Sequence, residues 1–235
     1  MPELSSLLSP AELAALLLSL KVALRAVAFS LPLAILVAWV LVRARFPGIW
    51  LLDALVHVPL VMPPVVVGYL LLLLFGVQGP FGSLLQQWFG VRLVFTAAGA
   101  SVATAVMSFP LMVRAIRLSF EAIDRGLEDA ARTLGAGPLD RFATVTLPLA
   151  LPGILSGAVI AYAAALGEFG AVITFVSNVP GETQTLPLAI YSATQTPGGE
   201  AAAARLAAIS FALALAGLIL SEVLARRVRR MLGRG

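Results

Sequence analysis

Long apolar runs separated by short polar segments dominate this chain. A helix needs about 20 apolar residues to cross the hydrocarbon core of a bilayer, and somewhat fewer where flanking charged side chains reach the headgroups. An amphipathic stretch over residues 10–25 precedes the first run and is expected to lie at the membrane interface. The pattern predicts an all-α polytopic membrane protein with five transmembrane helices, over residues 26–42, 55–75, 93–113, 152–176 and 201–225.

The composition indicates that lipid surrounds most of the chain. Of the 235 residues, 60% are apolar and only 12% are charged. A water-soluble domain needs more polar residues than this to cover its surface. No Ser/Gly-rich linker and no block of charge divides the sequence, so residues 1–235 are expected to form a single transmembrane domain.

The stretch over residues 183–195 is apolar enough to touch the membrane, but Pro187, Tyr191 and Gln195 interrupt it and it is short of a full span. If it does not cross, five spans place the N-terminus outside and the C-terminus in the cytoplasm. This orientation satisfies the positive-inside rule. It turns most basic residues toward the cytoplasm: Arg43, Arg45, Arg114, Arg117, Arg125, Arg132, Arg141, Arg226, Arg227, Arg229, Arg230 and Arg234.

Prolines recur where a soluble helix would avoid them. Pro59, Pro63 and Pro64 fall in the second predicted span, and Pro148 and Pro152 at the entry to the fourth. Each proline removes a backbone donor and kinks or starts a helix. In lipid such breaks are tolerated where neighbouring helices or a water-filled cavity satisfy the freed carbonyl groups. Two interpretations stay open, a transport path and simple bends that improve packing.

A polar segment between the third and fourth spans is the most informative part of the sequence. Apolar residues recur at helical spacing from Ile123 to Leu134, which predicts an amphipathic helix. Asp124 can cap this helix and Gly135 can end it, and Pro138 suits the first position of a second short helix. Small side chains on such a helix would let it enter a groove on a partner. The alternative is a helix that only lies on lipid headgroups.

The same segment resembles the EAA loop of bacterial ABC-importer permeases, with the consensus E-A-A-x3-G-x9-I-x-L-P. Asp129 stands where the consensus has glutamate, although Glu128 is adjacent, and Val145 stands where it has isoleucine. The resemblance implies that residues 118–147 form coupling helices in a cleft of an ATPase subunit. The residues that it assigns to ATPase coupling are Glu128, Asp129, Ala130, Ala131, Gly135, Leu147 and Pro148.

The resemblance extends along nearly the whole chain, and three segments look most like the molybdate branch of these permeases. They are VPLVMPPVVVGYLLLLLFG, GEFGAVITFVSNVPGETQTLPLAIY and ARTLGAGPLDRFATVTLPLALPGIL. The resemblance implies a type I ABC importer permease in the bacterial cytoplasmic membrane, as a homodimer with two cytoplasmic ATPase subunits and an extracytoplasmic oxyanion-binding protein. The implied cargo is molybdate or tungstate, and the alternative is sulfate, thiosulfate or another oxyanion.

Several functions are disfavoured by what the sequence lacks. It has no G-x4-G-K-[ST] phosphate loop, so ATP and magnesium are expected on a partner chain and no cofactor on this one. It has no cysteine and one histidine, His57, so no metal site is expected, and no catalytic constellation, so it is not expected to be an enzyme. Nucleic acid is not an expected partner. An ion-driven secondary carrier would need more intramembrane acids and inverted repeats, and a membrane scaffold leaves the polar loop unexplained.

Glu168 is the only ionisable residue deep in an apolar run. Charge inside a membrane is costly and usually functional, but a carboxylate repels an oxyanion. The open interpretations are a partner for Arg205, Arg92 or backbone amides, and a glutamate at the interface. Hydroxyl and amide groups suit an oxyanion path better, and no tight anion site is expected in the spans. The candidate path or gate residues are Glu168, Phe169, Gly170, Thr183 and Thr185.

Overall fold

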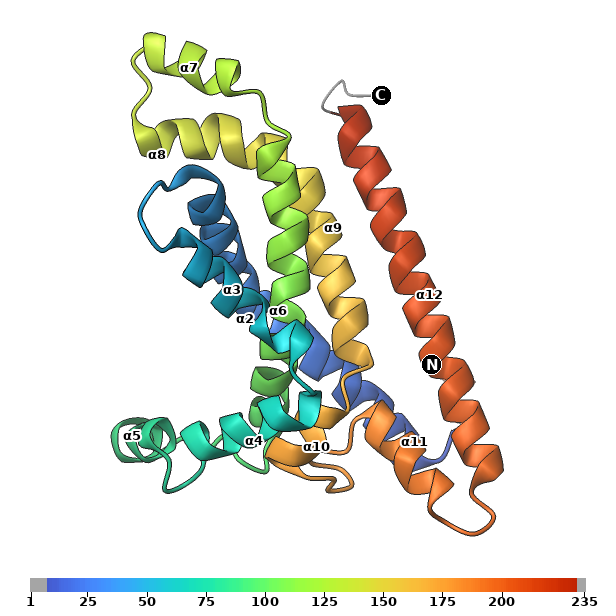
Figure 1. The fold of residues 1–235 in the computed structure, drawn as a ribbon. Coiled ribbons are helices and arrows are strands. Elements are labelled where there is room, and N and C mark those ends of the chain that lie inside the picture. Colours follow the sequence, from blue (N-terminus) through green and yellow to red (C-terminus); the bar gives the residue numbers. More distant parts are fainter. Residues whose placement is uncertain (1–7, 232–235) are drawn as a thin grey trace.

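The fold is that of a computed structural model, which describes residues 8–231 and leaves Arg234 outside the described part. Every regular element in that part is a helix (Figure 1). The elements are α2 (Pro10–Arg43), α3 (Ile49–Val61), α4 (Pro64–Phe75), α5 (Pro80–Phe89), α6 (Ala97–Glu121), α7 (Arg125–Thr133), α8 (Pro138–Arg141), the π-helical turn η1 (Phe142–Thr146), α9 (Leu147–Leu166), α10 (Gly170–Val176), α11 (Leu186–Thr194) and α12 (Glu200–Met231).

Four helical segments are long and apolar enough to cross a membrane: α2, α6, the continuous segment from α8 to α9, and α12. The bent pair of α3 and α4 makes a fifth if it is taken as one span. The prediction of an all-α polytopic membrane protein is confirmed. Residues 10–25, which the sequence pattern separated from the first span, are continuous with it in α2. A capping box between Ser9 and Glu12 starts that helix.

The expected span over residues 55–75 is two helices and not one. α3 begins earlier, at Ile49, and the axes of α3 and α4 differ in direction by 115°. Met62 has an extended backbone, because the residue before a proline is pushed out of the helical region and Pro63 has no N–H to donate. α4 therefore turns away and leads to α5 at one end of the bundle (Figure 1).

The expected span over residues 152–176 is also interrupted. α9 begins at Leu147 and ends at Leu166, and α10 restarts the helix at Gly170. α11, in the ambiguous stretch over 183–195, has nine residues and is about 14 Å long, too short to cross the hydrocarbon. Its first amide, on Leu186, donates to Ser19 Oγ of α2 at 2.6 Å.

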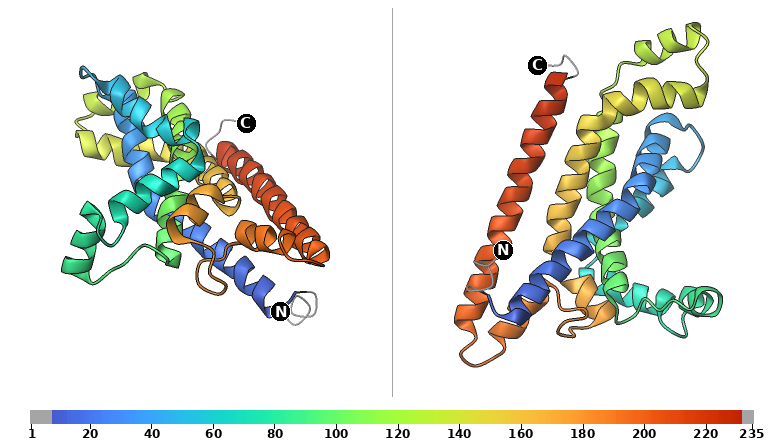
Figure 2. Two further views of the ribbon diagram at one scale, coloured as in Figure 1. Left: turned by 60° about the horizontal axis from the view of Figure 1, so that its bottom comes forward. Right: turned by 180° about the vertical axis from the view of Figure 1, so that it is seen from behind.

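The main core lies where α2, α6 and α9 pack together. Met112, Ile116 and Phe120 of α6 are buried against Ala34 and Ala38 of α2 and against the start of α9. A second core joins α4, α10 and the first half of α6. α12 lies beside α9, as Figure 2 shows from two further directions. Many of its apolar side chains are exposed, among them Phe211, Leu215, Leu218, Ile219, Leu220 and Val223. Wide apolar exposure on spanning helices suits contact with lipid or with another copy of the chain.

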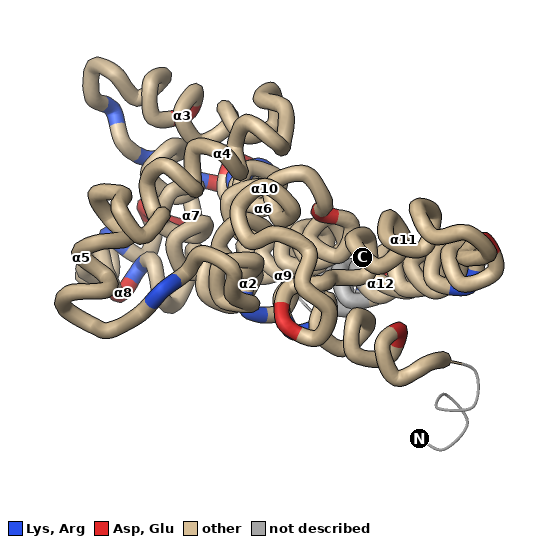
Figure 3. The backbone as a smooth tube through the Cα atoms, turned by 90° about the horizontal axis from the view of Figure 1, so that it is seen from below, with Lys and Arg blue, Asp and Glu red and all other residues tan. Residues whose placement is uncertain are grey.

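The two ends of the bundle differ in character. α7 and α8 lie at the same end as the last turns of α2, α6 and α12, and α4, α5, α10 and α11 lie at the other end (Figure 1). Figure 3 shows that charged residues occupy short stretches of a mostly uncharged backbone. The polar loop that contains α7 and α8 therefore projects from one end of an apolar bundle.

Candidate functional site

The loop between α6 and α9 is shaped by local sequence signals. The Asp124 carboxylate accepts a hydrogen bond from the Gly126 amide at 2.8 Å and caps α7. Gly135 ends the helix with φ +89°, and the Ala136 amide donates to the Ala131 carbonyl at 3.1 Å. A left-handed residue at this position is the usual end of an α-helix. α8 then begins at Pro138, so all three predicted helix ends of the loop are confirmed.

Glu128 points toward the bundle and holds α7 on it. Its carboxylate accepts hydrogen bonds from Arg43 Nη2 at 2.5 Å and from Thr146 Oγ1 at 2.8 Å. The Glu128 side chain is 18% exposed and the Arg43 side chain 17%. Arg43 ends α2 and Thr146 ends η1, so one carboxylate ties the loop to two membrane-spanning segments.

Four other loop residues, Asp129, Ala130, Leu134 and Leu139, are exposed. Within residues 8–231 the ion pair of the exposed Asp129 is with Arg132 of its own helix, at 3.5 Å, and Ala130 is exposed beside it. Leu134 is 88% exposed and Leu139 84%. Apolar side chains this exposed at the end of a polar loop are typical of a surface that a partner covers.

The EAA-like motif therefore divides into two parts. Leu147 packs against the main core and Ala131 is half-buried, so with Glu128 they lie on the inner side of the loop. Asp129, Ala130, Gly135 and Pro148 are exposed. Leu134 and Leu139 were missed as contact candidates, because helical spacing placed Leu134 on the buried face of α7. Leu134 and Leu139 lie on either side of the turn at Gly135, and this position in the sequence could have indicated that they are exposed.

The candidate path residues lie around the break between α9 and α10. Glu168 accepts a hydrogen bond from the Ala171 amide at 2.9 Å and so caps α10. The sequence left three partners open for Glu168, namely Arg205, Arg92 and backbone amides. The structure shows the backbone amide. Arg205 is instead 2.8 Å from Glu12, and Arg92 is 2.8 Å from Gln86.

Phe169 and Gly170 lie where the break between α9 and α10 meets the break between α3 and α4. A Cβ atom on Gly170 would come 2.7 Å from Pro64 Cβ, the first residue of α4. Phe169 stacks near Tyr191 of α11, with ring centroids 5.3 Å apart. The interrupted span of α9 and α10 thus contacts the interrupted span of α3 and α4 at Gly170.

The two threonine candidates are buried in the loop after α10. Thr183 is completely buried, and its hydroxyl accepts from the Val179 amide at 2.9 Å and lies 3.2 Å from the Ser177 carbonyl, to which it donates. The Thr185 hydroxyl is buried and has no hydrogen-bond partner among the described residues. Thr183 therefore braces its own loop.

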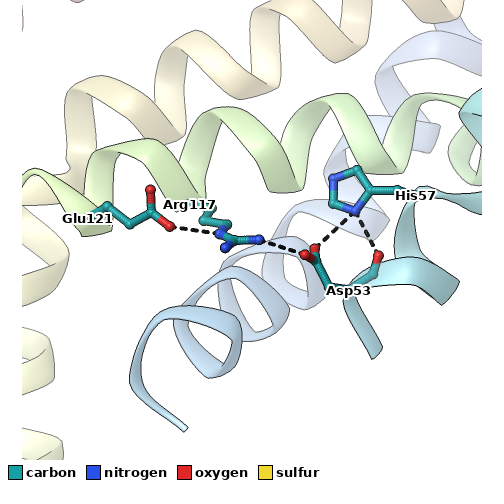
Figure 4. A network of polar contacts seen from close by, with 4 residues as sticks. All are labelled: Asp53, His57, Arg117 and Glu121. Atoms are coloured by element: carbon teal, nitrogen blue, oxygen red, sulfur yellow. Dashed lines mark hydrogen bonds and ion pairs between the residues drawn. The ribbon is translucent and has the colours of Figure 1, made fainter. Parts of the chain in front are cut away.

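A polar network that the sequence did not suggest joins α3 to α6 (Figure 4). Arg117 of α6 lies 3.0 Å from the Asp53 carboxylate of α3 and 2.8 Å from the Glu121 carboxylate. His57 Nδ1 lies 2.8 Å from the Asp53 carbonyl oxygen. Asp53 and His57 are four residues apart, a spacing that places them on one face of a helix and could have indicated their contact. Residues 8–231 contain no group of three or more potential metal ligands.

A helical bundle of membrane length, with interrupted spans and an exposed two-helix loop at one end, is the architecture of a membrane transport permease. The chain belongs to the family described as the binding-protein-dependent transport system inner membrane component, which its residues 30–230 match. It is accordingly a multi-pass protein of the inner membrane and a transport subunit.

Three curated relatives place the chain within this family. The molybdenum transport system permease protein ModB of Escherichia coli K12 is 60% identical over 228 residues, which cover 97% of this chain and 100% of that protein. ModB of Haemophilus influenzae is 54% identical, over 95% of this chain and 98% of that protein. The sulfate transport system permease protein CysT of Salmonella typhimurium is 36% identical, over 96% and 81%.

Solved structures share the fold. The chain is similar to a subunit of a bacterial alginate ABC transporter in complex with a pentasaccharide-bound periplasmic protein, with a TM-score of 0.75 and 18% identity over 94% of this chain and 81% of that one. It is also similar to an amino acid ABC transporter, with a TM-score of 0.64 and 22% identity over 93% and 94%. The predicted type I importer permease fold is confirmed.

Proposed function

We propose that this chain is the permease subunit of an ATP-driven importer that carries molybdate, or the chemically similar tungstate, across the cytoplasmic membrane. The observation that carries the proposal is the 60% identity to a molybdenum transport permease over that protein's full length. Sulfate is the second candidate, and the 36% identity to a sulfate permease favours it less.

The partners that this function requires are a second copy of the chain, two cytoplasmic ATPase subunits that bind ATP and magnesium, and an extracytoplasmic oxyanion-binding protein. The outward face of α7, with Leu134 and Leu139 beside it, supports an ATPase contact. The exposed apolar faces of α3 and α4 support a contact with a second copy. In this assembly the N-terminus lies outside and the C-terminus inside.

Motion of the ATPase subunits would reach the membrane through the loop. α7 is bound to the end of α2 by the pair between Glu128 and Arg43, and α8 continues through η1 into α9. A displacement of the loop therefore pulls on two spans at once. The spans would tilt and open the path to alternate sides of the membrane.

The gate is proposed at the contact between the two interrupted spans. Broken helices in transporters line substrate paths, because their freed backbone groups and helix ends face a polar cavity. Phe169 and Gly170 lie at this contact against Pro64, and Glu168 holds the end of α10 in place. Thr185, nearby in the chain, has a buried hydroxyl with no hydrogen-bond partner within residues 8–231.

The direct test is ATP hydrolysis by the purified permease with its ATPase subunits in liposomes. We expect hydrolysis to rise several-fold when the binding protein is loaded with molybdate, and much less with sulfate. Stimulation by sulfate alone would reassign the cargo. Transport by the permease without any nucleotide-hydrolysing subunit would contradict the proposed function.

The pair between Glu128 and Arg43 gives a first prediction. Replacing either residue with alanine leaves a mostly buried charge without its partner, and the coupling free energy between the two positions is expected to be about 1–2 kcal/mol. Uptake should fall several-fold in each single variant, and the double variant should lose less than the sum of the two losses. Thermal unfolding of the purified complexes measures the coupling, and additive effects would contradict the pair's role.

A further inference from the structure

A pocket of about 290 Å³ lies between the end of α2 and the coupling loop. Three separate segments line it, namely residues 43–45, the first turn of α7 and the end of α8. Its lining residues are Arg43, Arg45, Arg125, Glu128, Asp129 and Arg141. None of the candidate path residues lines this pocket, and of the residues assigned to ATPase coupling it shares Glu128 and Asp129.

The charges of the pocket are unbalanced. Arg43 is neutralised by Glu128, and Asp129 pairs with Arg132, which does not line the pocket. Within residues 8–231, Arg45, Arg125 and Arg141 make no ion pair. The cavity thus gathers four arginines and two carboxylates, and three of the arginines have no ion pair within residues 8–231, although like charges repel each other at such proximity.

Arg141 supplies a second and independent observation. Its Nε is buried and has no acceptor in the described part of the chain. A buried donor without an acceptor is costly, and in a protein it usually meets an ion or another group that the chain does not itself provide. The guanidinium group prefers planar, bidentate contacts to phosphate and carboxylate oxygens.

We propose that this pocket binds a phosphate-type oxyanion and thereby fastens the coupling loop to the end of α2. The anion would bridge Arg45 with Arg125 and Arg141, alongside the direct pair of Arg43 and Glu128. Such an anion has two possible sources, the phosphodiester of an anionic lipid headgroup and free inorganic phosphate. Basic pockets at the cytoplasmic ends of spanning helices bind lipid headgroups of this kind.

The test compares the permease with its ATPase subunits in two membranes. One membrane is phosphatidylcholine alone, and the other also contains phosphatidylglycerol. Retained phosphatidylglycerol is measured by mass spectrometry, and binding of inorganic phosphate by calorimetry in phosphatidylcholine nanodiscs. The variant replaces Arg45, Arg125 and Arg141 with glutamine. The matched control is Arg114→Gln, at an exposed arginine of α6 outside the pocket that has no ion pair within residues 8–231.

Each arginine near a membrane surface contributes roughly fivefold to the binding of an anionic headgroup, so the triple variant should bind about 100-fold more weakly. Loss of phosphatidylglycerol with the control unchanged identifies the lipid as the source, and loss of phosphate binding identifies the free anion. A lysine triple variant should retain part of the binding, because it keeps the charge but not the planar fork.

Equal anion binding by the wild type and the glutamine variant would overturn the proposal. The proposal would also be overturned if the glutamine variant lost its ATPase subunits and kept its anion binding. A carboxylate of the partner would then be the ligand of these arginines. Lipid retention is read without any transport, so a failure of the proposed cargo leaves the result for the pocket intact. The inference rests on the proposed function for the orientation of this end toward the cytoplasm and for the ATPase subunits present in the test.

Discussion

Replacing Gly135 with valine is expected to reduce uptake roughly tenfold or more while the protein still inserts into the membrane. Gly135 has φ +89°, and a Cβ added there would meet nothing within 4 Å. The cost is therefore conformational and not steric, about 1–2 kcal/mol for the left-handed region and higher for a β-branched side chain. α7 would end differently and move Leu134 and Leu139 away from the proposed ATPase contact. Uptake in cells and the amount of protein in the membrane measure the two effects.

Two variants control for this effect. Gly137 also has open space around its Cβ position, but its φ is −68°, so Gly137→Ala should transport almost as well as the wild type. Gly135→Asn should keep part of the activity, because asparagine tolerates the left-handed region. Uptake at the wild-type rate in Gly135→Val would count heavily against a coupling role for the loop.

Local chemistry made the loop predictable from the sequence. Asp124, Gly135 and Pro138 each act through their own backbone or that of near neighbours, so their residue types alone indicated where the helices begin and end. The apolar runs indicated the membrane-spanning helices, because the hydropathy of a segment reports whether lipid or water surrounds it. The resemblance to a family of permeases began with the fixed spacing of one short segment and extended along nearly the whole chain.

Features that depend on tertiary packing were not predictable. The partner of Glu128 is 85 residues away in the sequence, and no pattern along the chain links the two. Leu134 fits the apolar stripe of an amphipathic helix, yet it is exposed, because α7 is held to the bundle by a carboxylate and not by its apolar face.

The interrupted spans were only half predictable. Prolines in the second span indicated a break, and Pro63 explains the bend. The break after α9 has no proline. It follows from Gly167 and from the ability of Glu168 to cap a new helix, and its position opposite Pro64 emerges only from the packing of α10 on α4.

The largest loss of stability is expected for Gly153→Val, at the contact between α9 and α6. A Cβ added to Gly153 would overlap the side chain of Ser119. The Ser119 hydroxyl itself donates to the Ala150 carbonyl across the two helices at 3.2 Å. Small residues let spanning helices approach this closely, and van der Waals packing is the main attraction between helices in lipid. Valine should therefore force α9 away from α6 and cost about 1–3 kcal/mol or more.

This contact lies close to the loop between the two helices, since α6 ends at Glu121 and α9 begins at Leu147. Gly153→Val should lower the thermal unfolding temperature in detergent and the yield of folded protein, together with uptake. Gly217→Ala, in α12 where it faces α9, is the control, because its Cβ would lie 3.8 Å from the nearest atom, the Cβ of Ala163. Exchanging the small residues, with Gly153→Ala combined with Ser119→Gly, should recover much of the stability that Gly153→Ala alone loses. If the double variant is as unstable as the single one, close packing at Gly153 is not what holds these helices together.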